Sequence, residues 1–513
     1  MTKGALVAET VQQQAAALPA PPTVVLTPDA AEAERAKEAG RAAHDRRRWL
    51  AFVVLCLGTL MEVLDTTIVN VALPSVKADL GFTAAGLAWV VNAFMLTFGG
   101  FLLLGGRLGD LYGPRKLFLG GIVLFTAASA TCGIAQTAFV LVAARAVQGV
   151  GAAVVSAVAL SLIMNLFTEM RERTKAMAYF GFIAAGGGSV GVLLGGVLVN
   201  SLDWHWVFLV NVPIGIAVFV AGLRLLPKAP LEGARPKLDI VGALTITGAM
   251  LLLVSAVVGG NEAGWTSART LGLFGGAAAL LVAFFATELR VRDPLVPLAI
   301  FRVRSVAVAN AVGVLWAAAM FAWFFLSALY MQLVLGYTPL QVGLGFLPAN
   351  LIMASFSFGL SAKMVDRYGI RAPLALGLAL AAVGLALLAR APVDGHFAVD
   401  VLPAMVLLGL GAGMAFNPVL LAAMNDVKPS ESGLASGIVN TSFMMGGALG
   451  LAILASLAAS RTLALGGPSS VGALNAGYHA AFLAGAFAAG VAALLGGLLL
   501  RMKGPAPATT PIH

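Results

Sequence analysis

Long apolar stretches follow one another along almost the whole chain, and they restrict its fold more than any other feature. A helix needs about 20 apolar residues to cross the hydrocarbon core of a bilayer, and fourteen stretches provide them. These stretches cover residues 49–74, 86–106, 117–136, 138–166, 176–199, 205–226, 239–260, 270–289, 305–335, 340–361, 372–391, 400–424, 432–460 and 478–501. Most of the segments between them are short. The sequence therefore predicts an all-α polytopic membrane protein with fourteen transmembrane helices.

The composition indicates that lipid is the solvent of these helices. Hydrophobic residues make up 60% of the chain and charged residues only 11%, with a mean hydropathy of +0.94. A soluble protein of this length needs more charge to cover its surface. Cys56 and Cys132 lie in apolar stretches without CxxC spacing, so we expect packing roles for them and no metal site.

The net charge of +9 is explained by topology and not by a nucleic-acid surface. An even number of spans places both termini on one side of the membrane, and basic residues concentrate in cytoplasmic loops. With the amino terminus in the cytoplasm, only Lys77, Arg269, Arg390 and Arg461 fall in outer segments, and Arg145 falls within a span. We therefore expect cytoplasmic termini, a lipid bilayer as the surroundings, and no nucleic-acid partner.

A repeated loop divides the spans into two halves. The loop GGRLGDLYGPRK, residues 105–116, and the loop SAKMVDRYGIR, residues 361–371, share the pattern D-x-Y-G-x-R at an offset of 256 residues. Each loop joins the second and third helices of a half. Two similar repeats around a central cavity are typical of transporters. The alternative is that both loops are ordinary turns, in which such residues are common.

The repeat sets the expected domain boundaries. Eight spans separate the two loops, whereas two halves of six helices each would place only six spans between them. Two extra helices therefore lie between the halves. No signal peptide is expected before residue 49, because the first apolar stretch is too long and lacks a cleavage site. The expected segments are 1–48 as a disordered cytoplasmic tail, 49–226 as an N-terminal six-helix bundle, 227–304 as a linker with two transmembrane helices, 305–501 as a C-terminal six-helix bundle, and 502–513 as a cytoplasmic tail.

Four motifs, in this order, give the chain a family resemblance. They are LDTTIVNVALP at 64–74, GGRLGDLYGPRK at 105–116, LVAARAVQGVGAA at 141–153 and DWHWVFLVNVPIG at 203–215. Together they resemble the fourteen-helix drug/proton antiporter branch of the major facilitator superfamily. One departure is that the usual Gly-Pro pair of the fifth helix is here Gly191-Val192.

The resemblance implies a monomeric, multi-pass protein of a bacterial inner membrane that needs no cofactor. It implies exchange of protons for small organic molecules such as drugs, antibiotics or cationic lipophilic compounds, by alternating access. A uniporter or proton symporter for one metabolite on the same fold is the alternative. An enzyme is not expected, because the chain has five His, no HExxH and no GxxxxGK[ST].

Two acids in the first span are the strongest functional signal. Glu62 and Asp65 are three residues apart, so they share one helix face, and a charge at mid-membrane costs about 2.5–3.5 kcal/mol on insertion scales. Both cannot ionise cheaply in a poorly solvated site. Arg145 lies about 10 Å below the outer end of its helix and Asp65 about 13 Å, so the two can pair. We expect a proton-coupling site of Asp65, Glu62 and Arg145, with Glu62 either recognising a cationic substrate group or binding a second proton. The alternative for Asp65 is a purely structural ion pair.

Two further groups of residues follow from the family resemblance. A conformational latch at the cytoplasmic face would consist of Gly106, Arg107, Asp110, Gly113, Arg115, Asp366 and Arg371, with Asp110 reaching across the two halves. Gly187, Gly191 and Gly195, at four-residue spacing, make a groove for close helix approach. Together with Gly196 they would lie between the two halves.

Polar and aromatic residues within spans are candidates for the substrate cavity. Aromatic faces suit flat or cationic organic molecules, although core packing explains such residues equally well. The candidates are Asn70, Gln148, Trp316, Trp323, Tyr330, Gln332, Asn417 and Asn440.

Overall fold

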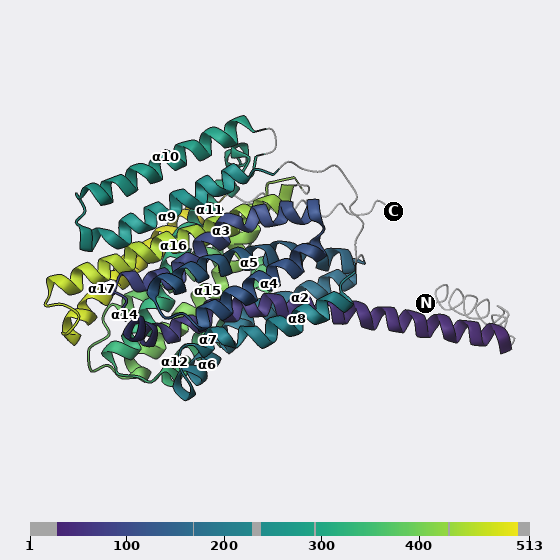
Figure 1. Ribbon diagram of the computed structural model, residues 1–513, viewed down its shortest axis with the longest axis horizontal. Coiled ribbons are helices and arrows are strands. Elements are labelled where there is room, and N and C mark those ends of the chain that lie inside the picture. The colour runs from purple at the N-terminus through teal and green to yellow at the C-terminus, as the bar shows by residue number, and fades with distance from the viewer. Residues whose placement is uncertain (1–27, 168, 228–237, 292–293, 429–430, 501–513) are drawn as a thin grey trace, which may run out of the picture. The chain divides into compact units, whose positions relative to one another are not determined.

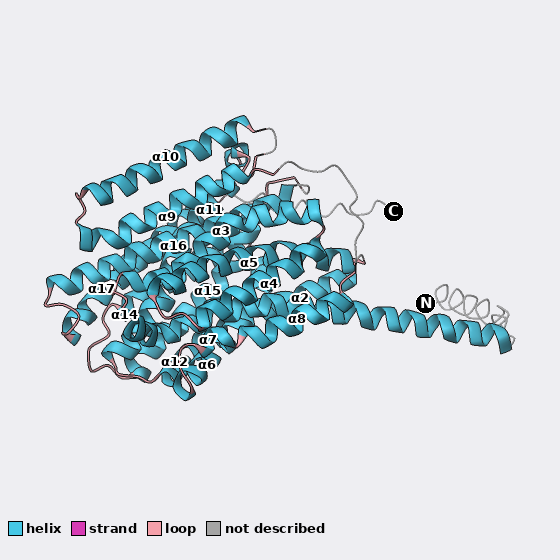
Figure 2. Ribbon diagram, viewed as in Figure 1, coloured by secondary structure: helices cyan, strands magenta, loops and turns pink. Residues whose placement is uncertain are grey.

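Helices form the whole ordered architecture of the computed structural model, which describes residues 28–167, 169–227, 238–291, 294–428 and 431–500. Figure 2 shows no strand in these residues. The chain divides into two compact units, residues 1–50 and 51–513, and the second contains the helical bundle. The prediction of an all-helical protein is therefore confirmed for the described part of the chain.

Most elements are long α-helices, joined by short 3₁₀ and π turns. The α-helices are α2 (Pro28–Leu80), α3 (Trp89–Tyr112), α4 (Pro114–Gly133), α5 (Ala138–Leu166), α6 (Met170–Ser201), α7 (Trp206–Leu209), α8 (Asn211–Leu225), α9 (Ile240–Ala263), α10 (Ala268–Arg290), α11 (Arg304–Leu329), α12 (Pro339–Ser355), α13 (Ser361–Tyr368), α14 (Arg371–Leu388), α15 (Leu402–Met424), α16 (Ser432–Ala464) and α17 (Val471–Leu499). The shorter turns are η1 (Gly86–Ala88), η2 (Leu298–Arg302), η3 (Tyr330–Val334), η4 (Phe356–Leu360) and η5 (Phe397–Val401).

Twelve helical segments in the described residues are long and apolar enough to cross a membrane. Two further predicted spans correspond to α6 and α12. Within the described residues their apolar parts are shorter, Val190–Ser201 and Pro339–Ser355. The lengths and composition of these helices are those of a multi-pass membrane protein.

The expected disordered tail is wrong for residues 28–48, which form the first turns of α2. The reason is local sequence, because this stretch is rich in Ala, Glu, Lys and Arg, all strong helix formers. Residues 1–27 and the predicted tail 502–513 lie outside the described residues.

The sequence repeat is also a repeat of structure. Gly113 and Gly369 end α3 and α13 with φ of 92° and 72°, a backbone region that favours glycine. The same offset separates two glycines that allow close helix contacts: a Cβ on Gly121 would lie 3.1 Å from the carbonyl oxygen of Gly151, and one on Gly377 would lie 2.8 Å from that of Gly411. The third and fourth helices of each half therefore pack in the same way.

The two extra helices pack on the outside of the bundle. Figure 1 shows α10 beside α9 at one edge, and α9 packs on both α3 and α16. A Cβ on Gly100 of α3 would overlap the Thr247 hydroxyl of α9. Near the other end of α9, Asn261 Nδ2 donates to Ser456 O at 2.8 Å, and Ser456 Oγ donates to Val257 O at 3.1 Å. Helix α9 thus contacts both halves.

Candidate functional site

A fully buried carboxylate, Asp65 of α2, is the centre of the most polar cluster among the described residues of the bundle. Arg145 of α5 donates from Nη1 to Asp65 Oδ2, and neither side chain has any exposed surface. Gln148 Nε2 donates to Asp65 Oδ1 at 2.7 Å, and Asn211 Nδ2 of α8 donates to the same oxygen at 3.1 Å. The Asp65 carboxylate thus accepts three hydrogen bonds from N–H donors, two of them on Oδ1.

The Arg145 guanidinium is fixed on several sides. Its Nε donates to Val90 O at 2.9 Å and its Nη1 also donates to Gln148 Oε1 at 2.8 Å. Its Cζ lies 4.5 Å from the centre of the Phe94 ring and 5.6 Å from that of Phe208, distances at which a cation is attracted to an aromatic face. The predicted pairing of Arg145 with Asp65 is therefore part of a larger network across α2, α3, α5 and α8.

Two members of this network were not predicted. Asn211 Nδ2 contacts Ser129 Oγ at 3.1 Å as well as Asp65, and Ser129 Oγ donates to Phe208 O at 2.9 Å. Asn211 is a single polar side chain in an apolar stretch, and Ser129 is one of several small polar residues on α4. One feature of the sequence could have identified Asn211 as a site residue, namely its place inside the motif at 203–215. A buried amide side chain needs a hydrogen-bond partner.

Glu62 lies one helix turn from Asp65 and is half-buried. Its Oε2 is buried without a hydrogen-bond partner in the described part of the chain. The side chain of Thr66 on the same face bonds back to the Glu62 carbonyl at 2.7 Å. Glu62 Oε2 is thus an acceptor without a hydrogen bond, close to the Asp65–Arg145 pair. Glu62 is not part of the network of hydrogen bonds to Asp65.

The glycine groove lies elsewhere than expected. A Cβ on Gly187 would meet Leu60, one on Gly191 would meet Thr67 and Leu64, and one on Gly195 would meet Ile68. All these neighbours belong to α2, within the N-terminal half, so the expected contact between halves is wrong for these three glycines. Only Gly196 contacts the other half, where its Cβ would lie 2.8 Å from Pro339 O. The four-residue spacing predicts a groove but does not identify the helix that fills it.

The latch residues do not meet across the halves. Asp110 and Asp366 are exposed, and in the described residues neither forms an ion pair. Instead, Arg115 Nη2 donates to Leu223 O at 2.6 Å, and Arg371 Nε donates to Gly497 O at 3.1 Å. Each arginine thereby binds a carbonyl near the end of the last helix of its own half. Gly106 and Arg107 are half-buried on α3, and the latch itself stays a prediction.

Removing one of these arginines should loosen the corresponding half. We expect Arg115→Gln to lower the free energy of unfolding by about 1 kcal/mol, because a charged hydrogen bond to a helix end is lost at a partly exposed site. The thermal stability of the purified protein is measured by size-exclusion chromatography after heating. Lys116→Gln is the matched control, since it removes the same charge from the exposed neighbouring side chain. An equal loss in both variants would contradict a role for the Leu223 contact.

The substrate-cavity candidates separate into different environments. Gln148 belongs to the Asp65 network, and Asn70 Nδ2 bonds back to Thr66 O at 3.1 Å. Tyr330 donates to Pro392 O at 2.8 Å, and Gln332 Nε2 donates to Val71 O at 3.1 Å, which joins the two halves. Asn417 is half-buried on α15.

The two tryptophans differ in what surrounds them. Trp323 is fully buried, with its ring centre 4.3 Å from that of Phe324 and 6.4 Å from that of Phe346. Trp316 is equally buried but lines a cavity together with Asn440. Of the eight candidates, only this pair shares a described cavity.

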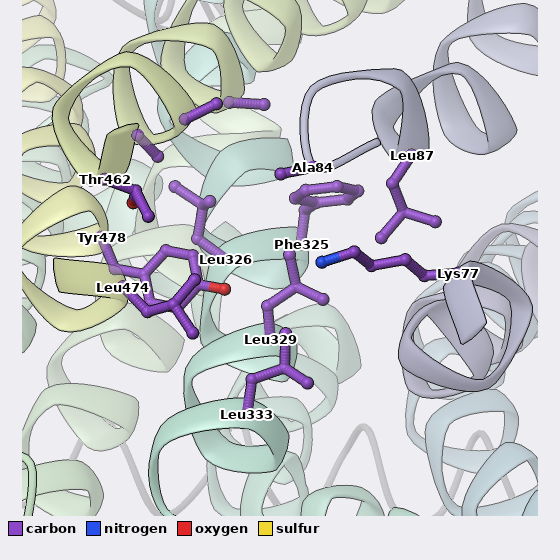
Figure 3. A pocket seen from close by; sticks show the side chains of 13 residues that line it. Lys77, Ala84, Leu87, Phe325, Leu326, Leu329, Leu333, Thr462, Leu474 and Tyr478 are labelled. Atoms are coloured by element: carbon purple, nitrogen blue, oxygen red, sulfur yellow. The ribbon is translucent and has the colours of Figure 1, made fainter. Parts of the chain in front are cut away.

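A second cavity lies near the carboxyl end of α2 (Figure 3). It lies between the halves, because its wall comes from α2 and η1 on one side and from α11, α16 and α17 on the other. Figure 3 shows the Lys77 side chain reaching from α2 toward Phe325 of α11, and Tyr478 on the α17 wall. Lys77 is the one charged side chain among its described lining residues.

Comparison with known proteins gives a consistent picture. The model of the Major Facilitator Superfamily matches residues 55–451. The puromycin resistance protein pur8 of Streptomyces alboniger is 39% identical over 87% of this chain and 90% of its own length. The cephamycin export protein CmcT of Amycolatopsis lactamdurans is 38% identical over 83% of this chain and 88% of its own length.

Solved structures agree on the fold. The crystal structure of an auto-inhibited POT family peptide transporter superposes with a TM-score of 0.63, covering 91% of this chain and 99% of the other, at 17% identity. At that identity the likeness concerns the fold alone.

Proposed function

The chain belongs to the Major Facilitator Superfamily, and on that premise we propose that it is a proton-coupled antiporter that exports small organic molecules from the cytoplasm by alternating access. It is a multi-pass membrane protein of a transporter family, not an enzyme. The names of its relatives, a puromycin resistance protein and a cephamycin export protein, support export of antibiotic-like compounds. Relatives from Streptomyces and Amycolatopsis support a bacterial cell membrane.

The proposed topology has fourteen spans with both termini in the cytoplasm. Helices α6 and α12, added to the twelve long apolar segments, bring the number of spans to fourteen. Helices α9 and α10 are the additional pair between two six-helix halves. In this orientation the D-x-Y-G-x-R loops face the cytoplasm, and the Lys77 cavity lies at the outer end. The Gln332–Val71 hydrogen bond then closes the halves against each other near that outer end.

The observation that carries the proposal is the completely buried Asp65–Arg145 pair. A proton that binds Asp65 Oδ2 removes the negative charge that holds Arg145. Gln148 Oε1 and Val90 O remain as acceptors for Arg145 Nη1 and Nε, so the guanidinium keeps two hydrogen-bond partners when the pair is broken. Release of the proton restores the pair. If the two states favour different arrangements of the helices, proton binding and the conformational cycle are coupled.

Everted membrane vesicles that contain the full chain test this proposal. With an imposed proton gradient, we expect uptake of puromycin to be accompanied by proton movement in the opposite direction. Collapse of the gradient with a protonophore should stop accumulation against a concentration gradient. Accumulation that persists without the gradient would refute antiport, while downhill flux alone, unaffected by the protonophore, would favour the uniporter.

Glu62 is the proposed recognition site for positive charge on the exported molecule. Its unpartnered Oε2 beside the Asp65 network is a suitable counter-charge. We expect Glu62→Gln to weaken binding of a permanent cation such as ethidium about tenfold, or 1.4 kcal/mol, and to leave a neutral compound unaffected. Binding to the purified protein measures this effect, and Glu262→Gln, an exposed acid on α9, is the control. Equal weakening of cationic and neutral ligands would contradict the proposal.

A further inference from the structure

Two acidic side chains lie close together where α9 begins and α10 ends. Asp239 is the N-cap residue of α9, and Glu288 lies in the last turn of α10. The two residues are only 6% and 5% exposed. We propose that they form a proton-binding site, in which one proton on Glu288 Oε1 is shared with Asp239 Oδ2. This site is separate from the Asp65 network, and it does not depend on the proposed antiport.

Each acid has one bonded and one unpaired carboxylate oxygen. Gly242 N donates to Asp239 Oδ1 at 2.7 Å, and Val296 N donates to Glu288 Oε2 at 3.1 Å. The other two oxygens, Asp239 Oδ2 and Glu288 Oε1, are buried without a hydrogen-bond partner in the described part of the chain. Both face the same point, since a Cβ on Gly242 would lie 2.6 Å from Asp239 Oδ2 and 3.0 Å from Glu288 Oε1. The glycine leaves the space between the two oxygens open.

A proton is the ligand that suits these two oxygens. Two ionised carboxylates in a poorly solvated site repel each other, and an unpaired buried acceptor is costly. A proton on Glu288 Oε1 turns this atom into a donor to Asp239 Oδ2, so that both unpaired oxygens are satisfied. Mg²⁺ and Ca²⁺ fit less well, because they take about six or more oxygen ligands. In the residues that the structure describes, no group of three or more acidic, His or Cys side chains is placed to hold a metal ion.

Neighbouring charges leave the pair without a counter-ion. The charged or titratable residues on the elements that pack on α9 and α10 are Arg107, Asp110 and Tyr112 on α3, Glu262 on α9, Arg269 and Arg290 on α10, Arg302 on η2, Arg304 on α11 and Arg461 on α16. Within the described ranges, none of them forms an ion pair with Asp239 or Glu288. Lys237 and Arg292 are close to the pair in sequence but lie outside the described residues, so the test includes them.

The Glu288 carboxylate also holds a segment that contacts both halves. Val296, whose N–H bonds to Glu288 Oε2, packs on a cluster of η2, α11 and α16 residues, and its neighbour Leu295 packs with Leu104 of α3. Repulsion between two ionised acids would push Glu288 away from Asp239 and strain this attachment. In the proposed topology these helix ends face the cytoplasm. The site would then make the connection between the halves respond to cytoplasmic pH.

Infrared spectra of the purified full chain, in a detergent without ester groups, test for the shared proton directly. A protonated carboxyl has a C=O stretching band that a carboxylate lacks. Near neutral pH, we expect Glu288→Gln and Asp239→Asn each to lose one component of this band, because a shared proton needs two acids. Glu262→Gln, which changes an exposed acid on α9, is the matched control and should keep the whole band.

The pH dependence of thermal stability is the second measurement. Carboxyls of the unfolded chain release their protons at ordinary acidic pH, whereas the shared proton stays bound in the folded protein. The stabilisation is therefore present at low pH and is lost as the pH rises until the pair releases its proton. Glu288→Gln keeps an N–H donor for Asp239 and does not titrate. Its Tm should match that of the wild type within about 1 °C at about pH 5 and exceed it by about 2–4 °C at about pH 9.

Several results would overturn the inference. One is a carboxyl band that stays complete in both Glu288→Gln and Asp239→Asn, and another is a Tm difference between wild type and Glu288→Gln that is equal at both pH values. Mg²⁺ or Ca²⁺ that raises the Tm of the wild type but not of Glu288→Gln would show a metal site. A band component that is absent from the wild type and appears in Lys237→Gln or Arg292→Gln would show that a basic side chain neutralises the pair. If Glu288→Gln does not fold, Asp239→Asn provides the same comparisons.

Discussion

Asp65→Asn should abolish exchange of protons for substrate while leaving the protein able to bind ligands. The asparagine side chain cannot take up and release a proton, so no step of the cycle can depend on proton binding at that position. We expect substrate-induced proton movement in everted vesicles to fall at least about 100-fold, which corresponds to about 2.7 kcal/mol. Ligand binding to the purified variant should remain measurable.

The same substitution also leaves Arg145 buried without its counter-charge, which costs about 3–5 kcal/mol. A double variant, Asp65→Asn with Arg145→Gln, separates the two effects because it removes both charges. Its thermal stability should recover most of the loss, whereas proton exchange should stay absent. Recovery of proton exchange in the double variant would show that the pair is structural and that the coupling site lies elsewhere. Asp79→Asn is the control for general effects of charge removal. Asp79 lies on α2, as Asp65 does, and accepts a hydrogen bond from Trp204 Nε1.

Gly149→Ala should be the most destabilising small substitution near the site. A Cβ at this position would overlap Thr97 Oγ1 and Phe94 O and lie 3.1 Å from the Phe94 carbonyl carbon, so α3 would have to move away from α5. The Thr97 hydroxyl cannot easily turn aside, because it bonds to the carbonyls of Ala93 and Phe94. We expect a loss of about 3 kcal/mol or more in the free energy of unfolding, together with loss of transport. Thermal stability and vesicle transport measure both effects.

The matched control for Gly149→Ala is Gly120→Ala on the adjacent helix α4. Nothing lies within 4 Å of a Cβ at Gly120, and alanine is the better helix former by about 1 kcal/mol. This variant should be as stable as the wild type or slightly more so. If Gly149→Ala behaves in the same way, the close packing of α3 on α5 is not what positions Arg145.

Much of the architecture could be predicted because membrane-spanning helices leave strong signals. The apolar stretches predict the helices, and the motifs predict the confirmed family. Similar depths in two spans indicate that Asp65 and Arg145 can meet. The D-x-Y-G-x-R repeat predicts two halves, and the matching turns at Gly113 and Gly369 show the same local geometry in both.

Other features depend on which helices become neighbours, which periodicity does not specify. Asn211 could not be assigned to the Asp65 cluster, because nothing in its own stretch indicates that α8 lies beside α2. For the same reason Gly187, Gly191 and Gly195 of α6 were expected between the two halves, whereas they pack on α2. Trp316 and Trp323 lie seven residues apart on one helix and are equally buried, so only their surroundings distinguish a cavity wall from core packing.

The contacts of α9 with both halves have a consequence for how far the halves can move apart. Near its first turns Ala243 packs with Leu104 of α3, and near its last turns Asn261 is bonded to Ser456 of α16. One end of α9 therefore contacts each half. If the two halves move relative to each other, as the proposed alternating access requires, the fixed length of α9 would limit how far they can separate. The added helix pair would then set the width of the opening, and with it the largest cargo that passes.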